Sequence, residues 1–381
     1  MEPLHNLVLE RFRDPESGLD AFLAIDSVVD SKAVGGVRIL GDVTLAEVSH
    51  MSRTMTKKYL FSGIRCGGAK AGIVMPGGAD RRALLLAFGR AIRPYIFRGF
   101  WPGTDLGSDI RDVRTILEGA GVPSFGGAGA HSDKYTAMGL VHSIDAALLH
   151  AGLRWSGLRF AIEGFGKVGS QAAVLMQGRG AKLVAFSNTR GSVSDPEGFD
   201  ASECAKSWKS KGSAFINSYG APEGRESLFG ADCDLLVPAA RCWSIHEGNF
   251  RKIRAKAIVG AANVPMSAAV EGALYRAGKT IVPDGIANCG GVAGLALSRY
   301  FGDEEIDRIF RSRLRPRVLS VLSEERPPSE SLEALIRQKR QAAGPKTLDV
   351  LLNVVKYHSS DRLFGKAELL NSLFPSISPI S

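Results

Sequence analysis

The stretch that most constrains the fold is a strand, a glycine turn and a helix in direct succession from Leu158. The apolar run LRFAIE precedes glycines spaced G-x-G-x-x-G, and the helical pattern SQAAVLMQ leads to a second apolar run, AKLVAFS. In this βαβ context the turn approaches a pyrophosphate closely, and the helix N-terminus attracts its charge. We therefore predict a dinucleotide-binding turn made by Gly164, Gly166, Lys167, Val168 and Gly169.

Three further short apolar runs follow, at residues 233–238, 257–260 and 280–283. Buried runs of this length separated by helical or loop stretches indicate a doubly wound parallel sheet. At 381 residues the chain is too long for one ordinary core, so we expect two domains. The predicted class is α/β, with an N-terminal α/β substrate domain at 1–135, a Rossmann-type domain at 136–335 and a C-terminal helical segment at 336–381.

The N-terminal part has its own α/β pattern. Apolar runs predict strands at 21–29 and 37–40, and Thr44 with Glu47 forms a capping-box signature that opens a helix with a buried apolar stripe. Further helices are expected at 83–92, where Pro94 should end the helix, at 110–117 and at 136–150. The segment between the helices at 83–92 and 110–117, WPGTDLGSD, is expected to be a loop.

Two lysines, Lys58 and Lys70, stand close together in the sequence MTKKYLFSGIRCGGAKAG. Gly67 and Gly68 have no Cβ, so another molecule can approach the backbone there, and we expect them to form a tight turn that presents Lys70. Two ammonium groups in one cleft repel each other, and burial adds to the effect, so at least one should have a lowered pKa and act as a base. The alternative is that both are ordinary solvated charges.

The residue at the position that usually binds the adenosine ribose is unusual. A carboxylate normally stands about 20 residues after the glycines of such a turn, but this chain has the run SNTRG, with Asn188 and Arg190. Arg190 could accept a 2′-phosphate, or it could be a solvated loop charge. The cofactor is therefore NAD or NADP, and Arg190 would suit the 2′-phosphate of NADP.

Composition excludes several classes of function. No apolar run is long enough to cross a membrane, and the net charge of +9 is dispersed rather than gathered into a nucleic-acid footprint. The five cysteines have neither disulfide-framework nor zinc-site spacing, and we predict no metal site. The N-terminus lacks the pattern of a secretory signal, so we expect a cytoplasmic protein.

Six motifs occur in the order and at the approximate spacing found in the glutamate/leucine/phenylalanine/valine dehydrogenase superfamily. They are MTKK followed by RCGGAKAG, then PGTDLGSD, Thr136, GFGKVG, GAANVP and PDGIANCGGV. The chain resembles this family from about residue 21 to residue 297, most closely its leucine and phenylalanine dehydrogenase branch.

This resemblance implies oxidative deamination of an L-amino acid to a 2-oxo acid and ammonia, with transfer of a hydride to NAD or NADP. By analogy, Lys58 holds the substrate carboxylate, Lys70 is the general acid and base, and Asp105 handles protons at the amino group. The remaining residues implied are Gly35, Gly36 and Asn288 for the substrate, and Thr136, Ala239, Asn263, Asn188 and Arg190 for the cofactor.

Two positions argue for an apolar substrate. Glutamate dehydrogenases of the family carry a lysine just before the glycine pair and a serine further on, whereas this chain has Val34 and Leu295. An unpaired side-chain carboxylate buried against Val and Leu would be costly. We therefore expect a branched-chain or aromatic amino acid and poor turnover of glutamate.

The resemblance also implies that C-terminal helices, expected at 332–342 and 348–357, pack back on the first domain, and that the protein is a homo-oligomer, a dimer or larger. Three alternative functions stay open. They are a glutamate dehydrogenase-like enzyme, a biosynthetic oxidoreductase that acts on an unusual amino acid through an imine, and a non-catalytic nucleotide-binding regulator. Retention of Lys58, Lys70 and Asp105 together argues against the regulator.

Overall fold

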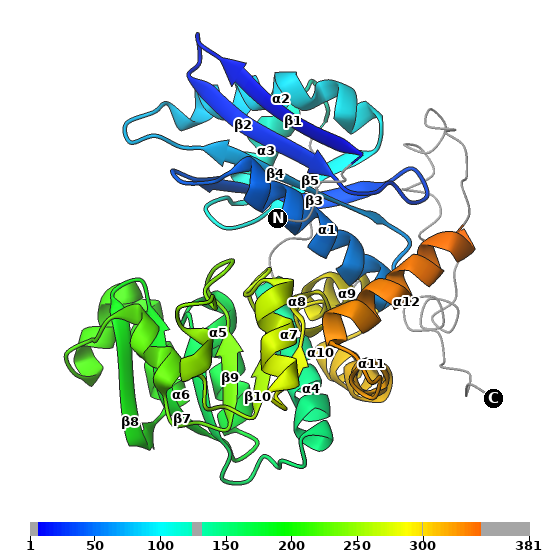
Figure 1. Cartoon of the computed structure of the whole chain (residues 1–381). Helices are drawn as coiled ribbons and strands as arrows, with labels where there is room; N and C mark the ends of the chain where they lie inside the picture. The colour runs from blue at the N-terminus through cyan, green and yellow to red at the C-terminus, as the bar shows by residue number, and fades with distance from the viewer. Residues whose placement is uncertain (1–6, 124–131, 299, 344–381) are drawn as a thin grey trace. The chain divides into compact units, whose positions relative to one another are not determined.

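The computed structural model describes residues 7–123, 132–298 and 300–343 (Figure 1). The chain forms two compact units. Among the described residues, one unit contains 7–123 and 336–343, and the other contains 132–298 and 300–335. Each unit has its own sheet.

The first unit is built on a five-stranded sheet with the order β1-β2-β4-β3-β5. Strand β2 is antiparallel to both β1 and β4. Strand β3 lies between β4 and β5 and is parallel to both. The strands are β1 (Val8–Asp14), β2 (Leu19–Ile25), β3 (Ala33–Leu40), β4 (Gly67–Val74) and β5 (Phe100–Thr104).

The two faces of β4 have different neighbours because side chains alternate along a strand. Ala69, Ala71 and Ile73 join the apolar core formed with α2 (Arg81–Phe97) and α3 (Ile110–Gly119). The opposite face is covered by α1 (Leu45–Ser62). Lys70 lies on the face of β4 that α1 covers, and the glycines two positions before and after it let the helix pack closely. Figure 1 shows this arrangement of helices and sheet.

The glycine pair before Lys70 does not form a turn, contrary to our prediction. Gly67 and Gly68 begin strand β4 itself, and a Cβ on Gly68 would lie 2.5 Å from the hydroxyl of Thr56 on α1. The close approach that the glycines allow is therefore made by other parts of the same chain, by α1 at Gly68 and by the backbone of Ser27 at Gly67.

Two other local predictions were wrong. Helix α2 continues through Pro94 to Phe97, because Ile92 and Ile96 are buried and anchor its last turn, which outweighs the single hydrogen bond that a proline removes. Residues 101–104 of the expected loop belong to strand β5 (Phe100–Thr104). By contrast, the helix predicted at 110–117 is confirmed as α3.

The second unit contains a six-stranded sheet with the order β11-β10-β9-β6-β7-β8. All neighbours are parallel except β7 and β8, which form an antiparallel pair that we did not predict. The strands are β6 (Arg159–Glu163), β7 (Lys182–Asn188), β8 (Gly191–Phe199), β9 (Leu235–Pro238), β10 (Ala257–Val259) and β11 (Thr280–Val282). The predicted doubly wound parallel sheet is thus confirmed.

Helices cover both faces of this sheet. On one face lie α4 (Ser132–His150) and α5 (Lys167–Gln177), and on the other α7 (Ala268–Arg276) and the 3-10 helix η2 (Arg225–Gly230) pack on a shared apolar core. From β6 the chain winds to β7 on one side, while β9 pairs on the other. The switch point of the sheet therefore lies between β6 and β9, where ligands bind in folds of this kind.

The remaining helices complete the described part of the structure. They are α6 (Ala201–Lys211), η1 (Gly212–Tyr219), η3 (Phe250–Lys252), α8 (Asp284–Ala287), α9 (Gly290–Leu297), α10 (Asp303–Ile309), the π-helix η4 (Phe310–Leu314), α11 (Arg315–Leu322) and α12 (Pro328–Ala343). The predicted helix at 332–342 lies within α12, whose Lys339 donates a hydrogen bond of 2.8 Å to the carbonyl of Leu60 on α1. The helix predicted at 348–357 lies outside the described residues. Among the described helices, none has the length and apolar character needed to cross a bilayer.

Candidate functional site

Lys70 and Asp105 form a buried ion pair in the first unit. The Lys70 Nζ lies 2.8 Å from Asp105 Oδ1, and the exposed fractions of the two side chains are 3% and 17%. Lys70 comes from the middle of β4, and Asp105 directly follows β5. Two residues predicted to be catalytic therefore meet in the structure, although 35 positions separate them in the chain.

Strand β3 lies between these two side chains, and its glycine pair makes room for them. A Cβ on Gly35 would lie 2.9 Å from the backbone nitrogen of Lys70, and a Cβ on Gly36 would lie 2.8 Å from the Cβ of Asp105. Any larger residue would push β4 or the start of the Asp105 loop away. Gly35 and Gly36 are thus placed beside both charged groups. Val34, the residue before them, is half-buried.

Asp105 is held in its ionised form. Burial alone would raise the pKa of its carboxyl group, but the positive charges of Lys70 and then Arg38 outweigh burial and lower the pKa to about 2. Since both cations also bond directly to the carboxylate, Asp105 is an acceptor at neutral pH and carries no proton of its own.

Arg38 and Glu47 are part of this cluster, and the sequence analysis did not include them in the site. The Arg38 Nε donates a hydrogen bond of 2.8 Å to Asp105 Oδ2, and its Nη1 pairs with Glu47 Oε1. Arg38 is two residues after Gly36, so it lies on the same face of β3, and this spacing was a signal that could have identified it. As predicted, Thr44 caps α1, but the Glu47 carboxylate turns to Arg38.

Lys58 lies near the C-terminal end of α1, as expected, with 7% of its surface exposed. It belongs to the helix that covers the Lys70 face of β4. Its role as a carboxylate-binding group, and a lowered pKa for one of the two lysines, stay predictions.

In the second unit the predicted glycine turn joins the end of β6 to the start of α5. Gly164 has a φ of +92°, and a Cβ there would lie 2.8 Å from the Cβ of Ala240 in the loop after β9. Gly166 is the N-cap of α5, and no side chain caps that end within the described part of the chain. Lys167, Val168 and Gly169 form the first turn of the helix. Its N-terminal amides can therefore bind an anion.

Asn263 and Asn288, predicted from separate motifs, contact each other. The Asn288 Nδ2 lies 3.2 Å from Asn263 Oδ1 and donates a hydrogen bond of 3.0 Å to the carbonyl of Ala261. The Asn288 side-chain oxygen is buried and has no hydrogen-bond partner among the described residues. A buried acceptor without a donor fits a site completed by a bound ligand.

The other predicted residues of this unit surround the carboxyl ends of its strands and α9. Thr136 of α4 contacts Gly291 at the start of α9. Ala239 follows β9 and donates its backbone N–H to the carbonyl of Glu163 at 2.7 Å. Leu295 of α9 is half-buried.

Asn188 is occupied by its own chain. Its Oδ1 accepts the backbone N–H of Arg190 at 2.8 Å, and its Nδ2 donates to the carbonyl of Ser213 at 2.8 Å. The side chain thus organises the turn between β7 and β8. Arg190 is exposed at that turn, and its Nε lies 3.4 Å from the Ser213 hydroxyl. This arrangement leaves most of the guanidinium accessible to a phosphate.

Glu163, the residue directly before the glycine turn, is a buried acid that sequence reasoning missed. It ends β6 at the switch point, and Ser244 from the loop after β9 donates a hydrogen bond of 3.0 Å to its Oε2. Burial raises the pKa of the carboxyl group to about 7, against smaller opposing effects from Ser244, the Ala240 amide and Arg225.

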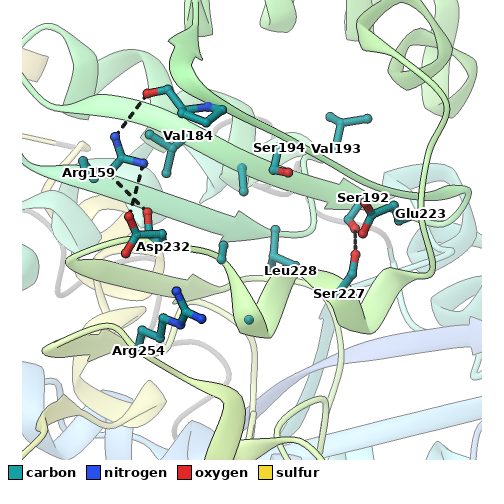
Figure 2. Close-up of a pocket in the computed structure, with 14 residues that line it drawn as sticks. Arg159, Val184, Ser192, Val193, Ser194, Glu223, Ser227, Leu228, Asp232 and Arg254 are labelled. Carbon is teal, nitrogen blue, oxygen red and sulfur yellow. Dashed lines mark hydrogen bonds and ion pairs between the residues drawn. The ribbon is translucent and has the colours of Figure 1, made fainter.

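A separate pocket of about 320 Å³ lies against β6, β7, β8 and η2 (Figure 2). Arg159 donates hydrogen bonds to the carbonyls of Pro196 and Asp232 there, and the hydroxyls of Ser192 and Ser227 are 2.5 Å apart. None of the predicted site residues lines it. The charged groups of the first unit are therefore not part of this pocket.

The described residues contain no group of three or more His, Cys, Asp or Glu side chains that could hold a metal. All five cysteines are free thiols, and burial raises the pKa of Cys66, four residues before Lys70, to about 12. The acid and base groups of the cluster are thus lysine and carboxylate side chains.

Two family descriptions match this chain. The model "Glutamate/Leucine/Phenylalanine/Valine dehydrogenase" matches residues 126–314, and "Glu/Leu/Phe/Val dehydrogenase, dimerisation domain" matches residues 11–119. Glutamate dehydrogenase of Thermotoga maritima is 33% identical over 290 residues, which are 70% of this chain and 68% of the relative.

Two further relatives are named for different cofactors. NADP-specific glutamate dehydrogenase A1 of Halobacterium salinarum is 30% identical, with 75% of this chain and 77% of the relative covered. NAD-specific glutamate dehydrogenase of Staphylococcus aureus is also 30% identical, with 74% and 73% covered.

Solved structures share the fold. Hetero-hexameric glutamate dehydrogenase of Thermus thermophilus, in a leucine-bound form, superposes with a TM-score of 0.73 at 23% identity over 88% of both chains. L-tryptophan dehydrogenase of Nostoc punctiforme gives a TM-score of 0.63 at 21% identity over 89% of this chain and 97% of the other.

Proposed function

Because the chain belongs to the glutamate/leucine/phenylalanine/valine dehydrogenase family, we propose that it oxidatively deaminates an apolar L-amino acid, with NAD or NADP as the hydride acceptor. The products are the 2-oxo acid and ammonia. The observation that carries this proposal is the buried pair of Lys70 and Asp105, flanked by Gly35 and Gly36.

The chemistry divides between these side chains. The cationic Lys58 binds the substrate α-carboxylate, and Lys70, in its neutral form, takes a proton from the water that attacks the imine carbon. Asp105 stays ionised and accepts hydrogen bonds from the substrate amino group and from Lys70, whose Nζ lies 2.8 Å from its Oδ1. When bound, the dinucleotide would supply the acceptor for the hydride that leaves the substrate Cα.

The second unit supplies the cofactor site. The uncapped N-terminus of α5 binds the pyrophosphate, with Gly164 and Gly166 allowing close approach. Thr136 and Asn263 hold the nicotinamide end, and the unsatisfied oxygen of Asn288 accepts a hydrogen bond from the bound substrate.

An apolar substrate follows from Val34 and Leu295, which are both half-buried and offer no charge to a side-chain carboxylate. The competing candidate is glutamate, which the names of three relatives favour. The tryptophan dehydrogenase with the same fold favours an apolar substrate in this architecture. Both candidates use the same catalytic groups and differ only at the substrate side chain.

The nicotinamide cofactor can be NAD or NADP, since relatives of both kinds match the chain. The exposed Arg190 and the engaged side chain of Asn188 favour NADP, because a guanidinium suits a phosphate and no carboxylate is present to bind ribose hydroxyls. We also propose a homo-oligomer formed through the first unit, which matches the dimerisation domain, and a cytoplasmic location.

The test is a panel of L-amino acids supplied with NAD and separately with NADP, in which the absorbance of the reduced nicotinamide is followed. We expect turnover of a branched-chain or aromatic amino acid to exceed that of glutamate. Fast oxidation of glutamate alone would replace the substrate assignment, and no oxidation of any amino acid would remove the proposed function.

A further inference from the structure

Asp105 is bound by a cation on each oxygen. Lys70 contacts Oδ1 at 2.8 Å, and Arg38 contacts Oδ2 at 2.8 Å through its Nε. Beyond Arg38, the Glu47 carboxylate pairs with Nη1. The four charges sum to zero, and side-chain exposure is 10% for Arg38 and 16% for Glu47. The arrangement is therefore a balanced, buried chain of charges rather than a surface ion pair.

The two cations are not equivalent chemically. Lys70 is the group that gains and loses a proton in the proposed reaction, whereas a guanidinium stays charged throughout. When Lys70 becomes neutral, Asp105 loses one of its two neighbouring positive charges. Arg38 is then the group that keeps the carboxylate ionised and in place.

Arg38 is itself fixed on two sides. Strand β3 pairs with β4 on one edge and with β5 on the other, and the Glu47 carboxylate from the first turn of α1 holds the far end of the guanidinium. The planar fork therefore has a defined orientation toward Asp105. A flexible lysine at this position would supply charge without that orientation.

We propose that Arg38 is a positioning residue that holds Asp105 by its Oδ2 oxygen, so that Oδ1 stays directed at Lys70 while Lys70 gives up and regains its proton. This inference rests on the proposed function, because it assigns Arg38 a part in the same reaction. The charged groups that act on Asp105 are Lys70 and Arg38, with Glu47 behind Arg38.

A purely structural role for the ion pair predicts a different outcome. If Arg38 only ties β3 to the loop after β5 and to α1, its removal lowers stability and leaves the pH dependence of catalysis unchanged. If it positions and ionises Asp105, its removal moves the pH range in which Asp105 is an acceptor. The pH profile separates the two.

The first experiment uses Arg38→Met, which removes the charge and keeps a long side chain. We expect the acidic limb of the pH profile of kcat/KM to move to higher pH by about one unit or more, and the plateau to fall about tenfold to a hundredfold, the range typical of supporting groups. Dinucleotide affinity, titrated by fluorescence, should change less than about twofold, because the proposed cofactor residues belong to the other unit.

Two further variants sharpen the result. Arg38→Lys restores the charge, so the acidic limb should return toward its wild-type position while kcat stays reduced. Arg11→Met is the control, because it removes an arginine of the same sheet whose guanidinium is more exposed and pairs with Asp20, away from Asp105. The control should leave the profile unchanged.

The second experiment does not depend on activity. Carbon-13 in the side-chain carboxyl groups of aspartate reports ionisation directly, and Asp105→Asn identifies the signal of Asp105. In the wild type this signal should stay in its ionised position down to about pH 4, whereas in Arg38→Met it should begin to titrate above that pH.

The inference would be overturned if Arg38→Met had the same pH profile of kcat/KM and the same carboxyl titration as the wild type. If Arg38→Met does not fold, Arg38→Lys decides, because wild-type kcat in that variant would mean that the orientation of the fork is unimportant. Failure of the proposed function is a separate result. It would appear as no oxidation of any amino acid by the wild type, and the carboxyl titration would still report on Arg38.

Discussion

Replacing Glu163 by glutamine should stabilise the protein above neutral pH and leave its stability unchanged in acid. Glu163 is a buried carboxyl group at the end of β6, with Ser244 as its hydroxyl donor. Glutamine has nearly the same shape and keeps an oxygen that can accept this hydrogen bond. The substitution therefore removes the charge and little else.

The magnitude follows from the shift in pKa, from 4.5 to about 7. A shift of roughly 2.5 units, at about 1.4 kcal/mol per unit, corresponds to about 3 kcal/mol of unfolding free energy. Below about pH 4.5 the carboxyl group is protonated in both states and costs nothing. Between about pH 4.5 and 7 the unfolded chain releases the proton and the folded chain retains it, so stability falls as pH rises and then levels off.

The assay is thermal unfolding of the wild type and Glu163→Gln across this pH range. For a unit of about 200 residues, 1 kcal/mol corresponds to about 2–4 °C, so the variant should melt roughly 6–12 °C higher at about pH 8 and at the same temperature near pH 4.5. Glu197→Gln is the control, because the side chain of Glu197 is 90% exposed. A difference in melting temperature that is independent of pH, or absent at pH 8, would refute the electrostatic reasoning.

Two predictions concern the substrate site. Gly36→Ala should lower turnover about a hundredfold, because the added Cβ would lie 2.8 Å from the Cβ of Asp105 and would displace it. Gly77→Ala is the control, because its added Cβ enters open space. Equal turnover rates for the two variants would contradict this reasoning. Val34→Lys combined with Leu295→Ser should raise kcat/KM for glutamate by at least about tenfold relative to the wild type, because the new groups can pair with the side-chain carboxylate. Kinetic assays with glutamate and the best apolar substrate check it, and an unchanged ratio would show that these two positions do not select the substrate.

The second unit could be predicted well from sequence because its signals are local. The strand, the glycine turn and the helix are contiguous from Leu158, and the buried apolar runs at β9, β10 and β11 stand out by composition. The antiparallel strand β8 was missed because its sequence, GSVSDPEGF, contains two glycines and a proline and is half exposed. Its pairing with β7 comes from tertiary context.

The chemistry of the first unit was predicted only in part. Lys70 and Asp105 could be proposed from their motifs, and the structure brings them together. The turn expected at Gly67 and Gly68 was wrong, since glycines that permit close approach give no indication of whether the neighbour is a ligand or a helix. Arg38 was missed because an isolated arginine in a predicted strand is usually interpreted as a solvated charge. Only the order of the strands in the sheet shows which carboxylate lies beside it.

The most direct measurement of the central claim is the turnover of Lys70→Ala with the best amino acid, together with its affinity for the dinucleotide. The account predicts that turnover falls by about 10²–10⁴-fold, as expected when a general acid and base is removed, while the cofactor binds as in the wild type. Turnover within about threefold of the wild type would contradict the assignment of Lys70, and with it the catalytic role given to the ion pair with Asp105.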